Sequence, residues 1–72
     1  MGIRDTFAAN LRRRRAETGL SQEALAAAAG VDRTYVSSLE RCVYAASLDV
    51  VERMAEALTI EPAELLRKRP SN

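Results

Sequence analysis

Residues 19–41 of the chain read GLSQEALAAAAGVDRTYVSSLER, and this stretch decides the fold. Gly19 can take the left-handed conformation that ends a helix, and Ser21 can cap the next one. Good helix formers follow Ser21 as far as Gly30, which stops the helix in the same way as Gly19. The pattern therefore predicts a short helix over residues 22–29.

A second short helix follows almost at once. Asp32 is a suitable N-cap, because its carboxylate can accept the amide hydrogen of Thr34 or Tyr35. We therefore expect a helix over residues 33–41. Two short helices separated by so few residues cannot pack antiparallel, so they must cross steeply, with Val31 filling the corner. The stretch predicts a helix-turn-helix.

Apolar spacing predicts one helix before this pair. Ile3, Phe7 and Leu11 recur every four residues among good helix formers, and the pattern stops at Gly19. This predicts a helix over residues 4–18.

Two more helices are expected after the pair. Ser47 can cap a helix over residues 48–58, and Pro62, favoured at a first helical position, opens a helix over residues 62–67. Residues 68–72 are expected to be a frayed tail. The expected buried stripe of the helix over 33–41 is Val36 and Leu39, with Val43, just past its end, as an open candidate. The expected stripe of the helix over 48–58 is Leu48, Val51, Ala55 and Leu58.

The composition fits one small all-α domain. The 72 residues include one Phe and no Trp, so the apolar content comes mostly from Ala, Leu and Val, which suits close-packed helices. A single cysteine and no histidine exclude an internal disulfide and an ordinary zinc site. No apolar run approaches the roughly 20 residues that span a bilayer, and there is no apolar signal region. We expect a cytoplasmic protein with no membrane contact, metal, cofactor or small-molecule ligand.

The charge is unevenly distributed along the chain. Eleven basic residues are nearly balanced by ten acidic ones, which gives a net charge of only +1. Residues 1–45 carry seven arginines against five acidic residues, whereas residues 46–72 carry four basic residues against five acidic ones. The weak positive excess therefore lies in the half that contains the helix-turn-helix.

The ordered set of these features resembles the Cro/cI-like helix-turn-helix family of phage repressors and small bacterial regulators. The matching residues are Leu11, Arg15, Gly19-Leu20-Ser21-Gln22, Leu25-Ala26, Gly30-Val31, Val36, Leu39-Glu40-Arg41, Leu48 and Ala57-Leu58. The resemblance covers roughly residues 5–66 and implies a five-helix, lambda-repressor-like domain. Within the family, DRTYVSSLER is most similar to the small controller proteins of restriction-modification systems.

The resemblance implies that the helix over 33–41 lies in the major groove of double-stranded DNA. The expected base-contacting residues are Arg33, Thr34, Tyr35, Ser37 and Ser38. Arg33 is the main candidate, because a guanidinium can donate two hydrogen bonds to guanine, worth roughly 1–3 kcal/mol of discrimination. Thr34 can offer its methyl group to thymine, and the two serines are short enough to permit close approach. Tyr35 either contacts DNA or packs partly against the helix over 22–29.

The resemblance also implies three phosphate contacts and one internal ion pair. Gln22 is expected to meet a phosphate and to brace the recognition helix, the alternative being a solvated first-turn side chain. Arg41 and Tyr44 are candidate backbone contacts. The family pairs an arginine at the position of Arg15 with a glutamate at the position of Glu40. The four consecutive arginines of residues 12–15 point in different directions, so we expect the first three to be mostly solvated, with one near DNA.

A homodimer is expected because two half-sites add their free energies when they are about 34 Å, or a multiple, apart. The candidate interface comprises Ile60, Pro62, Leu65 and Leu66. The alternative, that such residues only close the core, applies best to Leu65 and Ile60.

Cys42 stands where the family usually has glycine. Either the helix ends differently here, or the chain accepts a penalty of the order of 1 kcal/mol for left-handed geometry. A redox-sensing thiol is a further possibility, but the sequence shows neither a lowered pKa nor a second cysteine.

The function predicted from these residues is sequence-specific transcription regulation by a homodimer on a palindromic operator. Within that function, the resemblance favours the controller of a restriction-modification system. The alternative is a protein-binding module, such as an antitoxin subunit. An enzyme is not expected, because the nucleophile, base and metal options are nearly empty.

Overall fold

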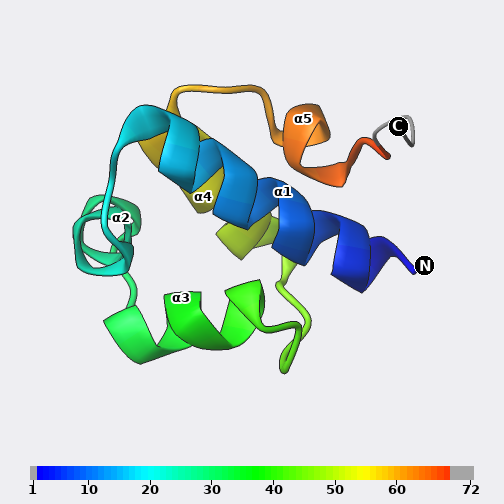
Figure 1. The fold of residues 1–72 in the computed structure, drawn as a ribbon, viewed down its shortest axis with the longest axis horizontal. Helices are drawn as coiled ribbons and strands as arrows, with labels where there is room; N and C mark the ends of the chain where they lie inside the picture. Colours follow the sequence, from blue (N-terminus) through cyan, green and yellow to red (C-terminus); the bar gives the residue numbers. More distant parts are fainter. Residues whose placement is uncertain (1, 69–72) are drawn as a thin grey trace.

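The computed structural model describes residues 2–68, and within them it contains five α-helices and no strand (Figure 1). The helices are α1 (Ile3–Thr18), α2 (Gln22–Ala29), α3 (Arg33–Glu40), α4 (Leu48–Leu58) and α5 (Pro62–Leu66). The all-α, five-helix prediction is confirmed. The first helix begins one residue earlier than expected, and α3 and α5 end one residue earlier. Of the expected frayed tail, residues 69–72 lie outside the described residues.

Two of the three predicted side-chain caps are present at helix starts. The Oγ of Ser21 accepts the amide of Ala24 at 3.0 Å, and the Oγ of Ser47 accepts the amide of Val50 at 3.1 Å. Asp32 occupies the N-cap position of α3, but its carboxylate accepts no capping hydrogen bond, so that prediction is wrong. Its backbone carbonyl takes the amide of Tyr35 at 3.0 Å instead.

Four of the helices end in the same left-handed motif. The left-handed residues are Gly19 (φ 75°), Gly30 (φ 72°), Cys42 (φ 60°) and Thr59 (φ 59°). In each case the amide of the following apolar residue returns to a carbonyl five positions back, as Val43 does to Ser38 at 2.9 Å. Cys42 therefore accepts the left-handed geometry rather than ending α3 in another way.

The core lies between α1, α3, α4 and α5, with α2 closing one end. The fully buried larger side chains are Leu11, Leu25, Val36, Leu39, Met54 and Leu65. Figure 1 shows α3 along the lower edge of the molecule, below α1, with α2 seen end-on beside it. This placement leaves the outer side of α3 uncovered.

Two residues that the periodicity assigned to the core are exposed, and so is the open candidate Val43. Ile3 is 62% exposed, Val43 50% and Leu48 81%. Ile3 and Leu48 are the first residues of their helices, and Val43 lies beyond the end of α3. At such positions the neighbouring helix no longer covers the stripe, so the pattern alone was misleading. No helix among residues 2–68 is long and apolar enough to cross a membrane.

Candidate nucleic-acid interface

The corner between α2 and α3 is built as the sequence predicts. Gly30 turns the chain, and the amide of Val31 returns to the carbonyl of Ala26 at 2.9 Å. Val31 is half-buried and packs against the core. The short connection therefore fixes α3 at a steep angle to α2, with one side of α3 free.

The side chains of α3 divide sharply between the core and the outer surface. Val36, Leu39 and Glu40 are buried, Arg33 and Thr34 are exposed, and Tyr35, Ser37 and Ser38 are half-buried. Tyr35 packs against the core cluster and stays partly accessible. The structure thus brings the five predicted base-contacting residues onto one short helix whose opposite face is anchored.

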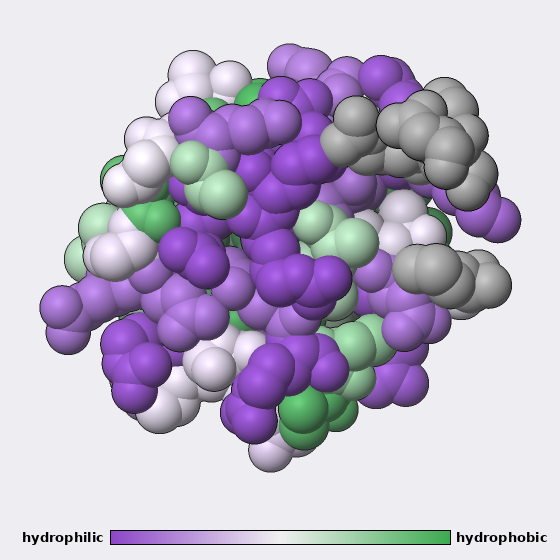
Figure 2. Space-filling model, viewed as in Figure 1, coloured by the Kyte–Doolittle hydropathy of each residue, from purple (hydrophilic) through white to green (hydrophobic). Residues whose placement is uncertain are grey.

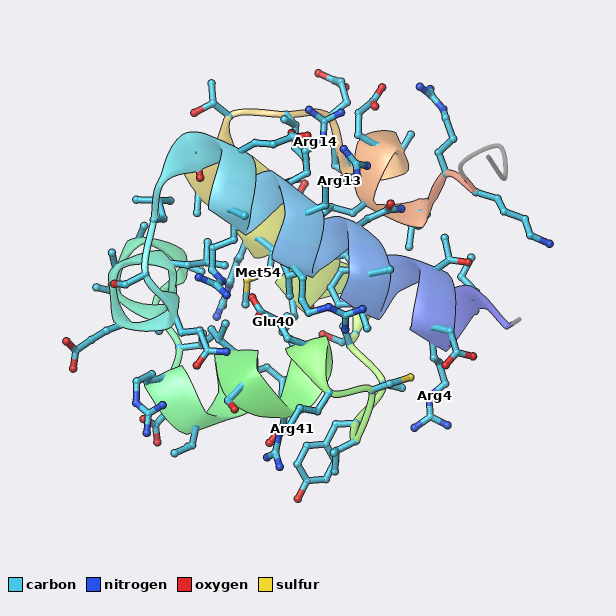
Figure 3. All side chains as sticks on the ribbon, in the orientation of Figure 1. Arg4, Arg13, Arg14, Glu40, Arg41 and Met54 are labelled. Atoms are coloured by element: carbon cyan, nitrogen blue, oxygen red, sulfur yellow. The ribbon has the colours of Figure 1, made fainter. Side chains whose placement is uncertain are left out.

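Glu40 joins three helices through its carboxylate, although only 3% of the residue is exposed. Arg15 donates from Nε to Oε2 at 2.5 Å and from Nη2 to Oε1 at 3.1 Å. Gln22 donates from Nε2 to Oε1 at 3.0 Å. Arg15 also donates to the carbonyl of Leu20 at 3.0 Å. The predicted contact between Arg15 and Glu40 is therefore present and links α1 to α3, and the bond from Gln22 adds α2. Figure 3 shows Glu40 between α3 and α1.

The hydrogen bond to Glu40 raises the pKa of Arg15, and partial burial opposes that rise. The guanidinium of Arg15 therefore stays charged beside the buried carboxylate of Glu40. Its two hydrogen bonds to the two carboxylate oxygens fix the relative orientation of the two side chains. The alternative that Gln22 is a freely solvated side chain does not hold, because its amide is half-buried and bonded to Glu40.

The expectation that Arg12, Arg13 and Arg14 are mostly solvated is wrong for two of them. Arg13 reaches Glu17 at 3.4 Å, and Arg14 reaches Glu64 of α5 at 3.0 Å. Both side chains are about three-quarters buried, with 26% and 28% exposed. Figure 3 shows them on the side of α1 that faces α5, away from α3. Arg13 pairs within α1 and Arg14 pairs with α5, so neither side chain belongs to the α3 surface.

Arg12 is the exposed member of this run, and it turns toward α3. Its Nη1 donates to the backbone carbonyl of Glu40. Arg41 is also exposed, and its Nε lies 3.4 Å from the carbonyl of Ser37. The end of α3 therefore carries two accessible guanidinium groups.

Cys42 lies beside the start of α1. Its Sγ donates to Oδ1 of Asp5 at 3.4 Å. Burial and this carboxylate raise the pKa of the thiol, and the charges of Arg4 and Arg12 act in the opposite direction. A thiol held in its neutral form does not have the character of a redox sensor.

The four residues predicted for a dimer interface are not together on one exposed surface. Leu65 is fully buried in the core, so its assignment to an interface is wrong. Ile60 is half-buried and Pro62 exposed, and Ile60 lies near Arg14 and Glu64. Leu66 instead lines a groove of about 150 Å³ at the other end of α5.

This groove brings together apolar residues that the sequence did not group. Its lining includes Ile3, Tyr44, Val51 and Leu66. Leu48 lies one helical turn before Val51. In the view of Figure 2 most of the surface is hydrophilic, with only small apolar areas between the polar side chains. The groove could not be predicted from the sequence, because helical spacing does not show that residues at helix ends, such as Ile3 and Leu48, are exposed.

A helix-turn-helix family model, HTH_3, matches residues 11–65. The chain belongs to this helix-turn-helix family. The matched region contains α2, α3 and α4 entire, half of α1 and most of α5. The prediction of a Cro/cI-like helix-turn-helix domain is thereby confirmed.

Three similar proteins show where the chain stands within the family. A hypothetical transcription factor from Neisseria meningitidis serogroup B is 44% identical over 89% of this chain, which spans 60% of that protein's length. Control protein C.BamHI of Bacillus amyloliquefaciens is 38% identical, over 89% of this chain and 80% of that protein. The crystal structure of the restriction-modification controller protein C.AhdI from Aeromonas hydrophila is 45% identical, with a TM-score of 0.84 over 86% of this chain and 94% of that one.

These relatives place the chain among helix-turn-helix transcription regulators, with similarity to the controller type. They are a transcription factor and control proteins, and this kinship confirms that the chain is not an enzyme.

Proposed function

We propose that this chain is a homodimeric, sequence-specific DNA-binding regulator that recognises a palindromic operator through α3. The observation that carries the proposal is the two-sided character of α3. Val36, Leu39 and Glu40 fix the helix from behind, while Arg33 and Thr34 project from its first turn. The first turns of such a helix are the part that meets base edges in the major groove.

Each outer residue of α3 has a role that suits its chemistry. Arg33 donates two hydrogen bonds to one guanine, and Thr34 offers a methyl group to thymine. Ser37 and Ser38 are short, so the helix can approach the floor of the groove. Tyr35 contacts DNA only with its accessible edge, because the rest of its ring packs on the core.

Phosphate contacts hold this helix in register. Gln22 lies at the start of α2, where the helix dipole favours an anion. One hydrogen of its amide is used by Glu40, which leaves the other for a phosphate oxygen. Arg41 and the hydroxyl of Tyr44 serve the same purpose beyond the end of α3, where both are exposed.

The dimer forms through the groove beside the segment that follows α3. Of the four interface residues predicted from the sequence, only Leu66 lines that groove, which it shares with Ile3. Arg4 and Tyr44 also line the groove, and in the proposed dimer only their apolar parts are covered, so that the Arg4 guanidinium and the Tyr44 hydroxyl stay available to DNA. Leu48, at 81% exposure, is the largest unprotected apolar side chain nearby. A palindrome of two half-sites requires a two-fold axis that presents both copies of α3 on the same side, and we assign that axis to this surface.

The similarity to controller proteins supports a role in the control of a restriction-modification system. Such a regulator acts on DNA in the cytoplasm. A neighbouring gene pair for a nuclease and a methyltransferase would support this role, and its absence would leave DNA binding as the proposal.

The experiment is selection of bound duplexes from a random DNA pool, followed by affinity measurement on the selected sequence. We expect the selected sequence to be a palindrome. Arg33→Ala should weaken discrimination between the selected base and its alternatives by about 5- to 150-fold per half-site, the equivalent of roughly 1–3 kcal/mol. The control is Arg53→Ala, an exposed arginine of α4 without an ion pair in residues 2–68. Failure to select any duplex would favour the protein-binding alternative.

A further inference from the structure

The arginines within residues 2–68 fall into two groups. Arg13, Arg14, Arg15 and Arg67 each pair with a glutamate, at 3.4, 3.0, 2.5 and 2.8 Å respectively. In this part of the chain Arg4, Arg12, Arg33, Arg41 and Arg53 form no ion pair. Arg33 and Arg41 belong to the two ends of α3, and Arg53 lies on α4. The remaining two, Arg4 and Arg12, are both on α1 and have no role in the interface described so far.

Both arginines lie beside the C-terminal end of α3. Arg12 donates to the backbone carbonyl of Glu40, the last residue of that helix. Arg4 lines the same groove as Tyr44, in the segment that follows α3. Figure 3 shows Arg4 and Arg41 pointing toward the same lower side of the molecule, along which α3 lies.

The carboxylate nearest this cluster is already engaged. Asp5 accepts from the thiol of Cys42 at 3.4 Å and from the amide of Gly2 at 3.3 Å. The charges of Arg4 and Arg12 act on the Cys42 thiol together with that of Asp5, and Arg41 is the neighbour of Cys42 in the chain. Three guanidinium groups therefore stand against one carboxylate around Cys42. The local charge is positive, although the whole chain carries only +1.

A helix in the major groove has a phosphate backbone on each side. On the side of α2, the helix N-terminus itself attracts an anion. The second phosphate backbone lies near the C-terminal end of α3. The partial charge of that helix end is negative, so it repels a phosphate. Cations are needed there, and those available beyond Arg41 are Arg4 and Arg12.

We propose that Arg4 and Arg12 of α1 bind phosphates of duplex DNA beside the C-terminal end of α3, extending the interface beyond the helix-turn-helix. This inference rests on the proposed function. It adds affinity that is independent of base sequence, because phosphate contacts carry no sequence information directly.

The experiment measures binding of the full chain to a random-sequence duplex of about 30 base pairs, by fluorescence anisotropy between about 50 and 200 mM salt. Each lost phosphate contact makes the slope of log affinity against log salt shallower by about 0.9. Between about 50 and 200 mM salt, the affinity of such a variant should therefore fall about 3.5-fold less than that of the parent. We expect this change in slope for Arg4→Ala and about twice the change for Arg4→Ala with Arg12→Ala. Arg4→Lys and Arg12→Lys, which keep the charge, should retain the slope. Arg53→Ala is the matched control.

If Arg12→Ala lowers the melting temperature, Arg4→Ala alone decides the outcome. The side chain of Arg4 makes no hydrogen bond or ion pair among the described residues, so its removal should leave the fold intact. An unchanged slope for Arg4→Ala, in a protein that melts like the parent, overturns the inference. The proposed function survives that result if Arg33→Ala still reduces discrimination on the selected palindrome. Conversely, a reduced slope with no sequence preference supports the phosphate contacts and contradicts the proposed function.

Discussion

Cys42 is held in a backbone conformation that suits glycine. Its φ of 60° lies in the left-handed region, where a side chain costs of the order of 1 kcal/mol. Helices α1 and α2 meet the same requirement with Gly19 and Gly30. Thr59 repeats the strain at the end of α4. The fold therefore carries avoidable strain at two helix ends.

Cys42→Gly should stabilise the protein. Relief of the strain outweighs the greater freedom of glycine in the unfolded chain, so we expect a gain of about 0.5–1 kcal/mol and a melting temperature higher by a few degrees. Thermal denaturation followed by circular dichroism measures the effect. Cys42→Ala is the control, because it keeps the strained Cβ and loses the contact with Asp5. DNA affinity should not change, and a lower melting temperature for Cys42→Gly would show that the thiol contact matters more than the strain.

The thiol of Cys42 should react slowly. Burial and the carboxylate of Asp5 raise its pKa, so the folded chain holds the thiol proton more tightly than the unfolded chain. The associated stabilisation is present below the pKa of the unfolded thiol and is lost as the pH rises through the folded value. Alkylation by iodoacetamide, measured as a function of pH, should therefore have a higher midpoint in buffer than in urea. Faster reaction in the folded chain would revive the redox interpretation.

At the scale of elements, Glu40 ties α3 to its neighbours. The carboxylate is almost fully buried and holds Arg15 and Gln22, which come from α1 and α2. Glu40→Ala should lower the free energy of unfolding by about 3 kcal/mol, because it leaves a guanidinium without its partner. Chemical denaturation measures this loss.

Arg67→Ala is the matched control for Glu40→Ala. Its ion pair with Glu64 joins residues three positions apart, and the Arg67 side chain is 64% exposed. Pairs of this kind contribute less than about 1 kcal/mol, so the variant should unfold much like the parent. If Glu40→Ala unfolds like the parent and loses only DNA affinity, the structural role of Glu40 is wrong.

The ends of the elements were predictable where a single residue determines them. Ser21, Gly30 and Ser47 act locally, so their effects follow from the sequence. The pairing of Arg14 with Glu64 joins residues 50 positions apart, and no local pattern indicates it. Asp32 was misassigned because its own carbonyl already takes the amide of Tyr35. Competition between a side chain and the backbone at one cap is decided by geometry rather than by residue type.

At the scale of the molecule, burial along α3 was better predicted than burial at the start of α4 and in α5. The outer residues of α3 follow from helical spacing once the buried ones are known. Leu48 was predicted to be buried and is exposed, whereas Leu65 was predicted to lie at an interface and is buried. Helical spacing shows which residues share a face, but it does not show whether another helix covers that face. Leu65 is covered by the core, whereas Leu48 remains open.

Leu48→Glu should separate the proposed dimer. A carboxylate placed within an apolar contact loses its hydration, so the dimer dissociation constant should rise by at least tenfold, or about 1.4 kcal/mol. The chain should remain folded, because Leu48 is not part of the core. Pro62→Glu is the control, since Pro62 is exposed at the opposite end of α5 from the groove. Sedimentation equilibrium gives the result, and equal dissociation constants for Leu48→Glu and the parent would place the interface elsewhere.

The central claim is that DNA meets the outer side of α3. Amide chemical shifts, recorded by NMR while the selected duplex is added, test it most directly. We predict the largest changes in residues 33–38 and at Gln22, with smaller changes at Arg4, Arg12 and Arg41. Changes concentrated in α4 and α5, with α3 unaffected, would contradict it.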